Sequence, residues 1–400
     1  MSNPDPVIAR LFDPISVPAF LEAHWEKEPL HLQRRTPDYY AGLFGLDEVE
    51  RYLFAVKPRG NELRLVARGK PDIVFQEHEE ASPRLVYQAF REGYTLNLNG
   101  VHRRWPAVHA LVDAVQRRFR CYANCNAYVT GPESQGFGTH HDGHDVLVLQ
   151  TSGRKRWRLY AVKEELPLEG STTPPGTGAD GWGEPVREIE LSAGDLLYLP
   201  RGTPHSAVTE DCCSVHVSIG IRPVLMEAVL SALVRNVVSK HVRWRRSVAP
   251  TGTRAAPSLQ AIVAQLSEDL SALGPLEPLL EGLEEQLLQP DEVVGLGPGG
   301  YLSSLERVGA LHLDSELECR PGHLGVIARN GDEVSLRFNG GSLVAPAFCE
   351  PALRYVLEHS RFRVRNLPDT LTGDARVTLC RRLVREGLLR AVGEEVSPRP

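Results

Sequence analysis

The spacing of apolar and polar residues changes along the chain, and the first zone, residues 1–118, mixes helical and strand patterns. Residues 20–32 begin as an amphipathic helix that should end near Pro29, because proline removes a backbone donor. Residues 45–56 and 105–119 show the same helical spacing of apolar side chains. We therefore expect three helices in this zone.

A second zone, residues 119–222, changes to short runs rich in β-branched and aromatic residues, punctuated by Gly, Pro and Ser. Short, regularly spaced strands of this kind are typical of an antiparallel sandwich or barrel. The predicted strands lie in 121–130, 144–153, 155–162, 195–202 and 213–221.

The third zone, residues 223–400, returns to helical patterns. The pattern of its final part, from about residue 315, predicts strands followed by helix. The expected segments are helices at 224–240, 259–273 and 277–289, a polar linker at 247–257 and a loop at 293–302.

Composition limits the class of protein. Hydrophobic residues make up 42% of the 400, enough for a sizeable core, so a fibrous or wholly disordered chain is excluded. A net charge of -6 argues against a chain built throughout to bind nucleic acid. No apolar run is long enough to span a membrane, and the N-terminus lacks the apolar core of a secretory signal.

The seven cysteines are an odd number and are scattered, which is not typical of a disulfide framework. Cys121 and Cys125 could be read as a metal pair, but no second pair follows at zinc-finger spacing. We expect buried free thiols in a reducing cytoplasm.

The most informative motif is the run of histidines and aspartates from 140 to 145. In a strand, His140 and Asp142 would share a face, with His141 on the opposite one. His205 follows a Pro/Gly turn after a later strand. A His-x-Asp pair alone is usually a solvated loop or a hydrogen-bonded core pair. Together, the two imidazoles and the carboxylate would leave three coordination positions open, as non-haem Fe(II) requires.

A second candidate lies in the basic run after Gly153. Alternation leaves three arrangements open: Lys155 points into the barrel, Lys155 points out and Arg154 or Arg156 points in, or all three side chains are solvated. A lysine inside a barrel needs a carboxylate partner, and a dicarboxylate co-substrate would supply one.

These segments resemble a known family. Residues 126–160, 194–208 and 214–220 are similar to the cupin-4 or JmjC-type ribosomal oxygenases, and 20–32 resembles that family's N-terminal signature. The resemblance implies an α+β protein with a double-stranded β-helix core (jelly roll, cupin, JmjC). It further implies an oxygenase domain at 1–222 with its barrel at about 119–222, a helical dimerisation region at 223–314 and a winged-helix-like domain at 315–400.

The resemblance also implies roles for single residues. His140, Asp142 and His205 would hold Fe(II), with 2-oxoglutarate and O2 as co-substrates. Asn126 and Tyr128, which alternation places on one face, would line the pocket. The implied cofactor-binding residues are Lys155, Asn126 and His216, and the implied substrate-binding residues are Tyr128, Asn126 and His144.

The activity implied is hydroxylation of a protein side chain, typically an arginine or histidine of a ribosomal protein. Some relatives have a substrate-contacting serine near the position of Gly220, where this chain has glycine. An alternative is hydroxylation of a peptide or small metabolite, since the fold is reused. We expect a cytoplasmic homodimer joined through the leucine-rich helices, with no membrane partner.

Residues 360–392 provide an alternative of another class, because they are rich in arginine and read as strand, helix, turn and wing. A winged helix with a basic face could contact nucleic acid, and the barrel would then be vestigial. The other interpretation is a solvated helix face whose charge Asp369, Asp374 and Glu386 balance. The presence of all four residues, His140, Asp142, Lys155 and His205, favours the enzyme.

Overall fold

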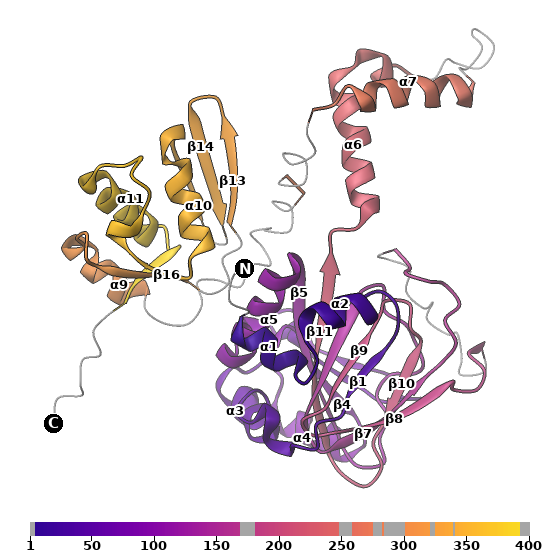
Figure 1. Ribbon diagram of the computed structural model, residues 1–400. Coiled ribbons are helices and arrows are strands. Elements are labelled where there is room, and N and C mark those ends of the chain that lie inside the picture. The colour runs from indigo at the N-terminus through magenta and orange to yellow at the C-terminus, as the bar shows by residue number, and fades with distance from the viewer. Residues whose placement is uncertain are drawn as a thin grey trace, which may run out of the picture. The chain divides into compact units, whose positions relative to one another are not determined.

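The computed structural model describes residues 5–168, 181–247, 258–274, 282–283, 301–320, 325–338 and 341–392. The chain divides into two compact units, residues 1–222 and 223–400. The ribbon in Figure 1 follows the chain from the indigo N-terminal unit to the yellow C-terminus.

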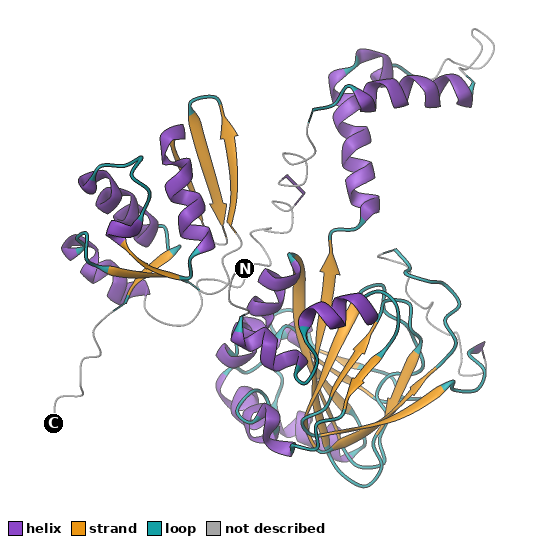
Figure 2. Cartoon of the chain, viewed as in Figure 1, coloured by secondary structure: helices purple, strands orange, loops and turns teal. Residues whose placement is uncertain are grey.

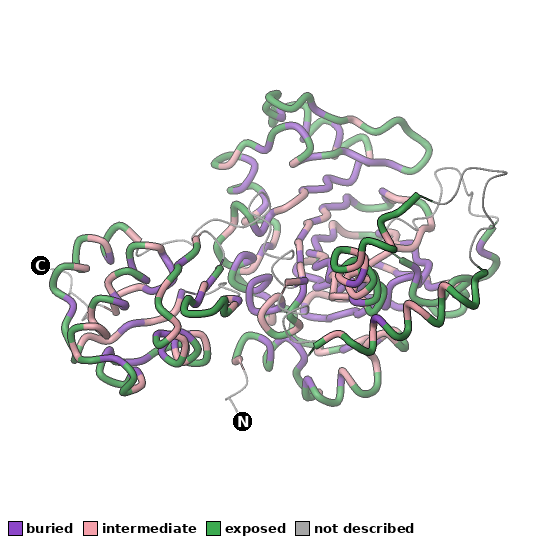
Figure 3. The backbone as a smooth tube through the Cα atoms, turned by 90° about the horizontal axis from the view of Figure 1, so that it is seen from above, coloured by how far each residue is buried: buried purple, intermediate pink, exposed green. Residues whose placement is uncertain are grey.

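The first unit is built on two antiparallel sheets. The larger has the strand order β1-β9-β6-β11-β5-β4-β2-β3 and the smaller β10-β7-β8. This is the antiparallel barrel that the period-two runs predict, and the strands are mostly buried (Figure 3). The strands are β1 (Leu30–Leu32), β2 (Leu63–Val66), β3 (Ile73–Val74), β4 (Thr95–Leu98), β5 (Cys121–Thr130), β6 (Asp145–Ser152), β7 (Arg154–Leu159), β8 (Arg187–Ser192), β9 (Leu196–Leu199), β10 (His205–Val208) and β11 (Ser214–Pro223).

Helices cover one side of these sheets (Figure 2). Their apolar faces form one core with the outer residues of the larger sheet, such as Cys125 of β5 and Leu147 of β6. A second apolar cluster, including Val148 and Trp157, lies between the two sheets. The helices are α1 (Pro6–Phe12), α2 (Val17–Ala23), α3 (Leu46–Ala55), α4 (Pro83–Arg91) and α5 (Pro106–Phe119).

The predicted helices at 45–56 and 105–119 correspond to α3 and α5, but the one predicted to run from residue 20 to Pro29 is wrong in its extent. Helix α2 ends at Ala23, and residues 30–32 form strand β1 instead. Trp25 leaves the helix to stack on Phe119, at 5.1 Å between ring centroids. Aromatic packing therefore ends this helix before the proline does.

The second unit contains helices and two further three-stranded sheets, with the orders β16-β12-β17 and β13-β14-β15. The helix predicted at 224–240 is α6, and the one at 259–273 is α7. The elements are α6 (Met226–Lys240), α7 (Leu259–Ser271), α9 (Tyr301–Arg307), β12 (Glu316–Cys319), β13 (Gly325–Asn330), β14 (Glu333–Phe338), β15 (Gly341–Pro346), α10 (Glu350–Glu358), β16 (Arg361–Arg363), α11 (Gly373–Arg385) and β17 (Leu389–Ala391).

Several predictions for this unit fall outside the described residues: most of the linker at 247–257, nearly all of the helix at 277–289 and most of the loop at 293–302. The end of that predicted loop is described, and Tyr301 begins helix α9 there. The meander β13–β15 was not predicted as a separate sheet. Among the described residues, no helix is both long and apolar enough to cross a membrane.

Candidate metal centre

His140, Asp142 and His205 converge at one end of the barrel, and their ligand atoms all lie within 4.8 Å of one another. His205 is the first residue of β10, as the turn before it predicts. The expected strand through His140 and Asp142 is wrong, because both residues lie in the loop before β6. His140 makes a single β-bridge with His205, with N–O distances of 3.1 and 2.8 Å, and this bridge brings the two imidazoles together.

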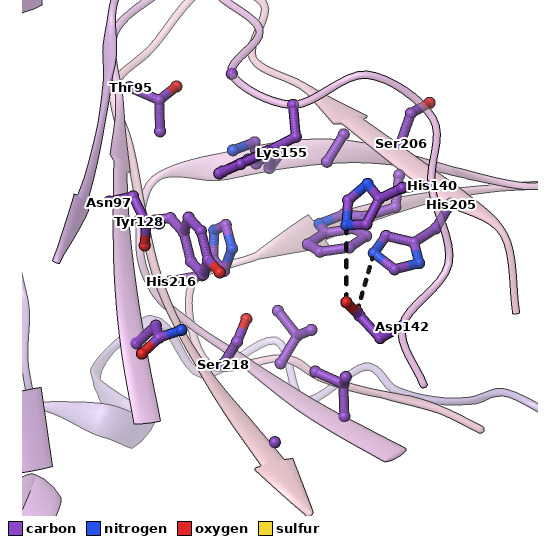
Figure 4. Close-up of a pocket in the computed structure, with 18 of the residues that line it drawn as sticks. Thr95, Asn97, Tyr128, His140, Asp142, Lys155, His205, Ser206, His216 and Ser218 are labelled. Carbon is purple, nitrogen blue, oxygen red and sulfur yellow. Dashed lines mark ion pairs between the residues drawn. The ribbon is translucent and has the colours of Figure 1, made fainter. Parts of the chain in front are cut away.

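The three side chains face a common point (Figure 4). His140 Nε2 lies 4.0 Å from Asp142 Oδ1, and His205 Nε2 lies 3.8 Å from Asp142 Oδ2. Both distances exceed hydrogen-bonding range, so no shared proton holds the cluster together. A cation between the three groups would satisfy all of them.

Backbone carbonyls fix the protonation of both rings. His140 Nδ1 lies 2.9 Å from Gly138 O, and His205 Nδ1 lies 3.0 Å from Thr203 O. A carbonyl only accepts, so each Nδ1 carries the proton and each Nε2 presents its lone pair toward Asp142. Hydrogen bonds of this kind orient the histidine ligands of metal sites.

The electrostatics suit a divalent metal. Burial, and next the charge of His140, lower the pKa of His205 to about 4, which keeps this imidazole neutral. Burial raises the pKa of Asp142, but His205 and His140 outweigh it, so the pKa lies below its ordinary value. Two imidazoles and one carboxylate are the donor set of mononuclear Fe(II) sites with open positions. The residues present therefore fit the metal that the resemblance implies.

A cavity of about 340 Å³ opens beside the three residues, within the size range of small-molecule sites. Its walls come from both sheets, and Figure 4 shows the side chains pointing into it. The lining residues are Arg64, Thr95, Asn97, Asn124, Asn126, Tyr128, Gly136, Phe137, His140, Asp142, His144, Val146, Val148, Lys155, Trp157, His205, Ser206, Ala207, His216, Ser218, Gly220 and Arg222.

Lys155 points into this cavity and is 5% exposed, whereas Arg154 and Arg156 point outward to ion pairs with acidic residues. Lys155 Nζ donates to Thr130 Oγ1 at 2.9 Å, and Thr130 Oγ1 lies 3.0 Å from Thr95 Oγ1. Burial lowers the pKa of Lys155 to about 7. Within the described part of the chain, no carboxylate pairs with this ammonium, so a ligand carboxylate would stabilise it.

The other predicted residues also border the cavity. Asn126 and Tyr128 lie on one face of β5, as alternation predicts. The Tyr128 ring stacks on His216 of β11 at 4.9 Å between centroids. His216 is buried, and its Nδ1 has no hydrogen-bond partner among the residues that the structure describes. His144 lies at the rim, where Arg222 Nη2 is 3.5 Å from its Nδ1.

Sequence reasoning missed several lining residues. Asn124 follows the same alternation as Asn126 and Tyr128 and could have been found by extending that pattern. Thr95 and Asn97 of β4 gave no such signal, because their place beside β5 depends on the pairing of the two strands. Cys121 and Cys125 lie in the core on the other face of β5, as buried thiols.

Comparison with known proteins gives relatives for this arrangement. Residues 102–229 match the family model of the JmjC domain. The chain is 30% identical over 251 residues to the bifunctional lysine-specific demethylase and histidyl-hydroxylase NO66 of Drosophila erecta, covering 60% of this chain and 38% of that protein. It is 31% identical over 218 residues to ribosomal oxygenase 1 of Danio rerio, covering 52% and 39% respectively. The chain thus spans about two fifths of the length of these curated relatives.

Solved structures share the fold over nearly the whole chain. The X-ray structure of Escherichia coli ycfD superposes with a TM-score of 0.61 and 21% identity, covering 94% of this chain and 98% of the other. The ribosomal oxygenase YcfD in complex with cobalt and 2-oxoglutarate gives a TM-score of 0.59 at 20% identity, covering 95% and 99%. These findings show that residues 102–229 form a JmjC domain, that the chain shares the fold of the solved ycfD structures, and that it is similar to proteins named as ribosomal oxygenases.

Proposed function

We propose that the protein is an Fe(II)- and 2-oxoglutarate-dependent dioxygenase that hydroxylates a side chain of a protein substrate. His140, Asp142 and His205 would hold the metal, whose chemistry is to activate O2 for attack on an unactivated C–H bond. The observation that carries the proposal is that one cavity holds both the His140, Asp142 and His205 cluster and a buried lysine, Lys155, which no described carboxylate pairs with.

The cavity residues would orient the co-substrate and exclude water. The ammonium of Lys155 and the hydroxyl of Thr130 would bind the carboxylate of 2-oxoglutarate that is distal to the metal. His216 can donate through its unsatisfied Nδ1 to a second ligand oxygen. Trp157 is buried, with its ring 5.6 Å from that of His205, and would help to exclude water beside the metal.

The hydrogen-bonding groups at the cavity rim favour a histidine over an arginine substrate. Arg222 Nη1 donates to Asn124 Oδ1 at 2.8 Å, so the Asn124 amide nitrogen is left to donate. Gly100 N donates to Asn126 Oδ1 at 3.0 Å, and Asn126 in turn donates to Tyr128, whose hydroxyl proton is then available. A neutral imidazole can accept from such groups, whereas a guanidinium has donors only. The names of the NO66 relatives agree with a histidine substrate.

Mass spectrometry of ribosomal proteins tests this proposal. Ribosomal proteins from cells that lack the chain are incubated with the Fe(II)-loaded enzyme and 2-oxoglutarate. We expect one histidine to gain the mass of one oxygen atom. Hydroxylation of an arginine would contradict the inferred preference for histidine but would still show a protein hydroxylase. Hydroxylation of a small metabolite, with no protein hydroxylated, would favour the alternative function in a biosynthetic pathway.

Asn124→Asp provides a matched variant. Arg222 can still donate to one carboxylate oxygen, while the second oxygen replaces the amide donor with an acceptor in the cavity. Turnover should shift from histidine toward arginine peptides of the same flanking sequence. An unchanged preference for histidine peptides would show that Asn124 does not contribute to substrate selectivity.

We further propose that the chain forms a homodimer through residues 223–314. On α6, Met226, Leu230 and Val234 are exposed at four-residue spacing, an apolar stripe that a second copy would cover. Light scattering should report a dimer for the wild type and a monomer for Leu230→Glu. A wild-type monomer would contradict the assignment.

For residues 315–400 we propose a separate winged-helix-like domain without a nucleic-acid role. Four of the seven arginines at 361–385 form local ion pairs: Arg361 with Glu316, Arg365 with Asp314, Arg376 with Asp369 and Arg382 with Glu386. Binding of RNA or duplex DNA by the full chain at physiological salt would contradict this. The seven free cysteines agree with a cytoplasmic location, which we also propose.

A further inference from the structure

A buried carboxylate lies behind the metal centre and is no part of it. Asp145, the first residue of β6, is 0% exposed and stands three positions after Asp142. Because a buried charge is costly unless it is paired and hydrogen-bonded, its partners must be held firmly in place.

Both oxygens of Asp145 are occupied. Oδ1 accepts from the Tyr198 hydroxyl at 2.8 Å and from Arg201 N at 3.3 Å. Oδ2 accepts from Arg201 Nη1 at 3.1 Å. Arg201 is itself 8% exposed, so the ion pair lies within the protein.

The partners form a closed ring through the N-terminal part of the chain. Arg201 Nη1 also donates to the carboxylate of Glu26, and Glu26 N donates to the Tyr198 hydroxyl at 2.9 Å. Glu26 has a φ of 56°, a left-handed conformation that a glutamate rarely adopts. Trp25 holds this turn in place by stacking on Tyr198, at 6.0 Å between centroids.

Two of the segments joined by this ring carry candidate metal ligands. Asp145 continues the loop of Asp142, and Arg201 lies four positions before His205 in the turn between β9 and β10. Gly202 N donates to Asp142 O at 2.9 Å, which ties the same two loops together next to the cluster. The Asp145–Arg201 pair therefore joins the same two loops as the hydrogen bond from Gly202 to Asp142.

We propose that Asp145 and Arg201 are positioning residues of the metal centre, which hold the Asp142 and His205 loops at ligating distance. The inference rests on the proposed function, since it assumes that the cluster binds a metal. Loss of the guanidinium would leave Asp145 buried without its counter-charge. The loops would have to separate to admit water, and the ligand atoms would separate with them.

A matched pair of variants separates positioning from stability. Arg201→Met removes the partner of Asp145, and Arg117→Met removes the partner of Asp113, a buried aspartate on α5 that lies in neither ligand loop. For the full chain, Co(II) affinity and the visible absorption of bound Co(II) are measured by titration without oxygen. The melting temperature is measured in EDTA.

We expect both variants to lower the melting temperature, but Arg201→Met alone to weaken Co(II) binding, by about tenfold or more, and to shift the absorption bands. Should Arg201→Met fail to fold, Arg201→Lys decides the question. Arg201→Lys keeps the positive charge but lacks the planar guanidinium group, so it should weaken Co(II) binding less than Arg201→Met does.

The proposal would be overturned if the Arg201 variant had a lowered melting temperature but bound Co(II) with the affinity and absorption of the wild type. The Asp145–Arg201 pair would then contribute to stability alone. A wild-type chain that binds no Co(II) is a different result, because it would overturn the proposed function itself.

Discussion

Lys155 Nζ donates a hydrogen bond to Thr130 Oγ1 over 2.9 Å, and both side chains are buried in the barrel. A threonine hydroxyl does not neutralise an ammonium group. A ligand carboxylate beside this pair would stabilise the protonated form of Lys155.

Replacing Lys155 with methionine should separate stability from binding. Removing a buried amine without a counter-charge should raise the free energy of unfolding, by about 1–4 kcal/mol. The same change should abolish 2-oxoglutarate binding to the Mn(II)-loaded protein. Thermal unfolding and calorimetric titration measure the two effects, and a stable variant that still binds the co-substrate would exclude Lys155 as its anchor.

The pH dependence of co-substrate binding follows from the pKa of Lys155, which burial lowers to about 7. Below pH 7 the amine is already protonated, so affinity should be constant. Above pH 7 a proton must be taken up on binding, so affinity should fall by up to about tenfold per pH unit. Calorimetry in two buffers at pH 8 should show uptake of about one proton. No uptake would contradict the buried, carboxylate-free environment.

The same shift has a consequence for stability. The folded state binds fewer protons than the unfolded chain between about pH 7 and the ordinary lysine pKa of 10.5, so this group makes stability rise with pH across that window. The Lys155→Met variant should lose this part of the dependence.

His216 offers a test of the second cofactor contact. His216→Phe keeps a ring against Tyr128 but removes the buried Nδ1 that lacks a partner. We expect an unchanged or higher melting temperature and a KM for 2-oxoglutarate raised about tenfold, the value of one hydrogen bond to a charged group. An unaltered KM for 2-oxoglutarate would mean that His216 packs against Tyr128 but does not bind the co-substrate.

Gly220 tests the substrate end of the cavity. A Cβ there would stand 2.6 Å from His144 Nε2 and 2.8 Å from Asn124 Oδ1, so Gly220→Ala should push both side chains away from their positions. The KM for the protein substrate should rise, while turnover of 2-oxoglutarate without substrate stays unchanged. Gly309→Ala is the control, since Gly309 does not line the cavity and no described atom lies within 4 Å of its Cβ.

Local patterns predicted much of the barrel and its face assignments. Alternation alone placed Asn126 and Tyr128 on one face, because a strand has a fixed period of two. The same rule could not decide between Lys155 and its neighbours, since three consecutive basic residues fit either register. The structure settles it, because Lys155 and Trp157 are buried whereas Arg154 is exposed and Arg156 half-buried.

Long-range contacts account for what the sequence could not predict. His140 and Asp142 converge on His205 without being in a strand, because a bridge between distant loops brings them together. The partnership of Asp145 with Arg201 and Glu26 depends on three segments meeting, and nothing in their local sequence indicates it. Helix α2 ends early for the same reason, through Trp25 and its distant aromatic partners.

Turnover of 2-oxoglutarate tests whether the chain is a 2-oxoglutarate-dependent dioxygenase. The wild type, His140→Ala and Lys155→Ala are loaded with Fe(II) without oxygen and then exposed to air, and succinate is measured. We predict that the wild type forms succinate and that neither variant does. A wild type that binds neither Fe(II) nor 2-oxoglutarate, or a His140→Ala variant as active as the wild type, would contradict the account.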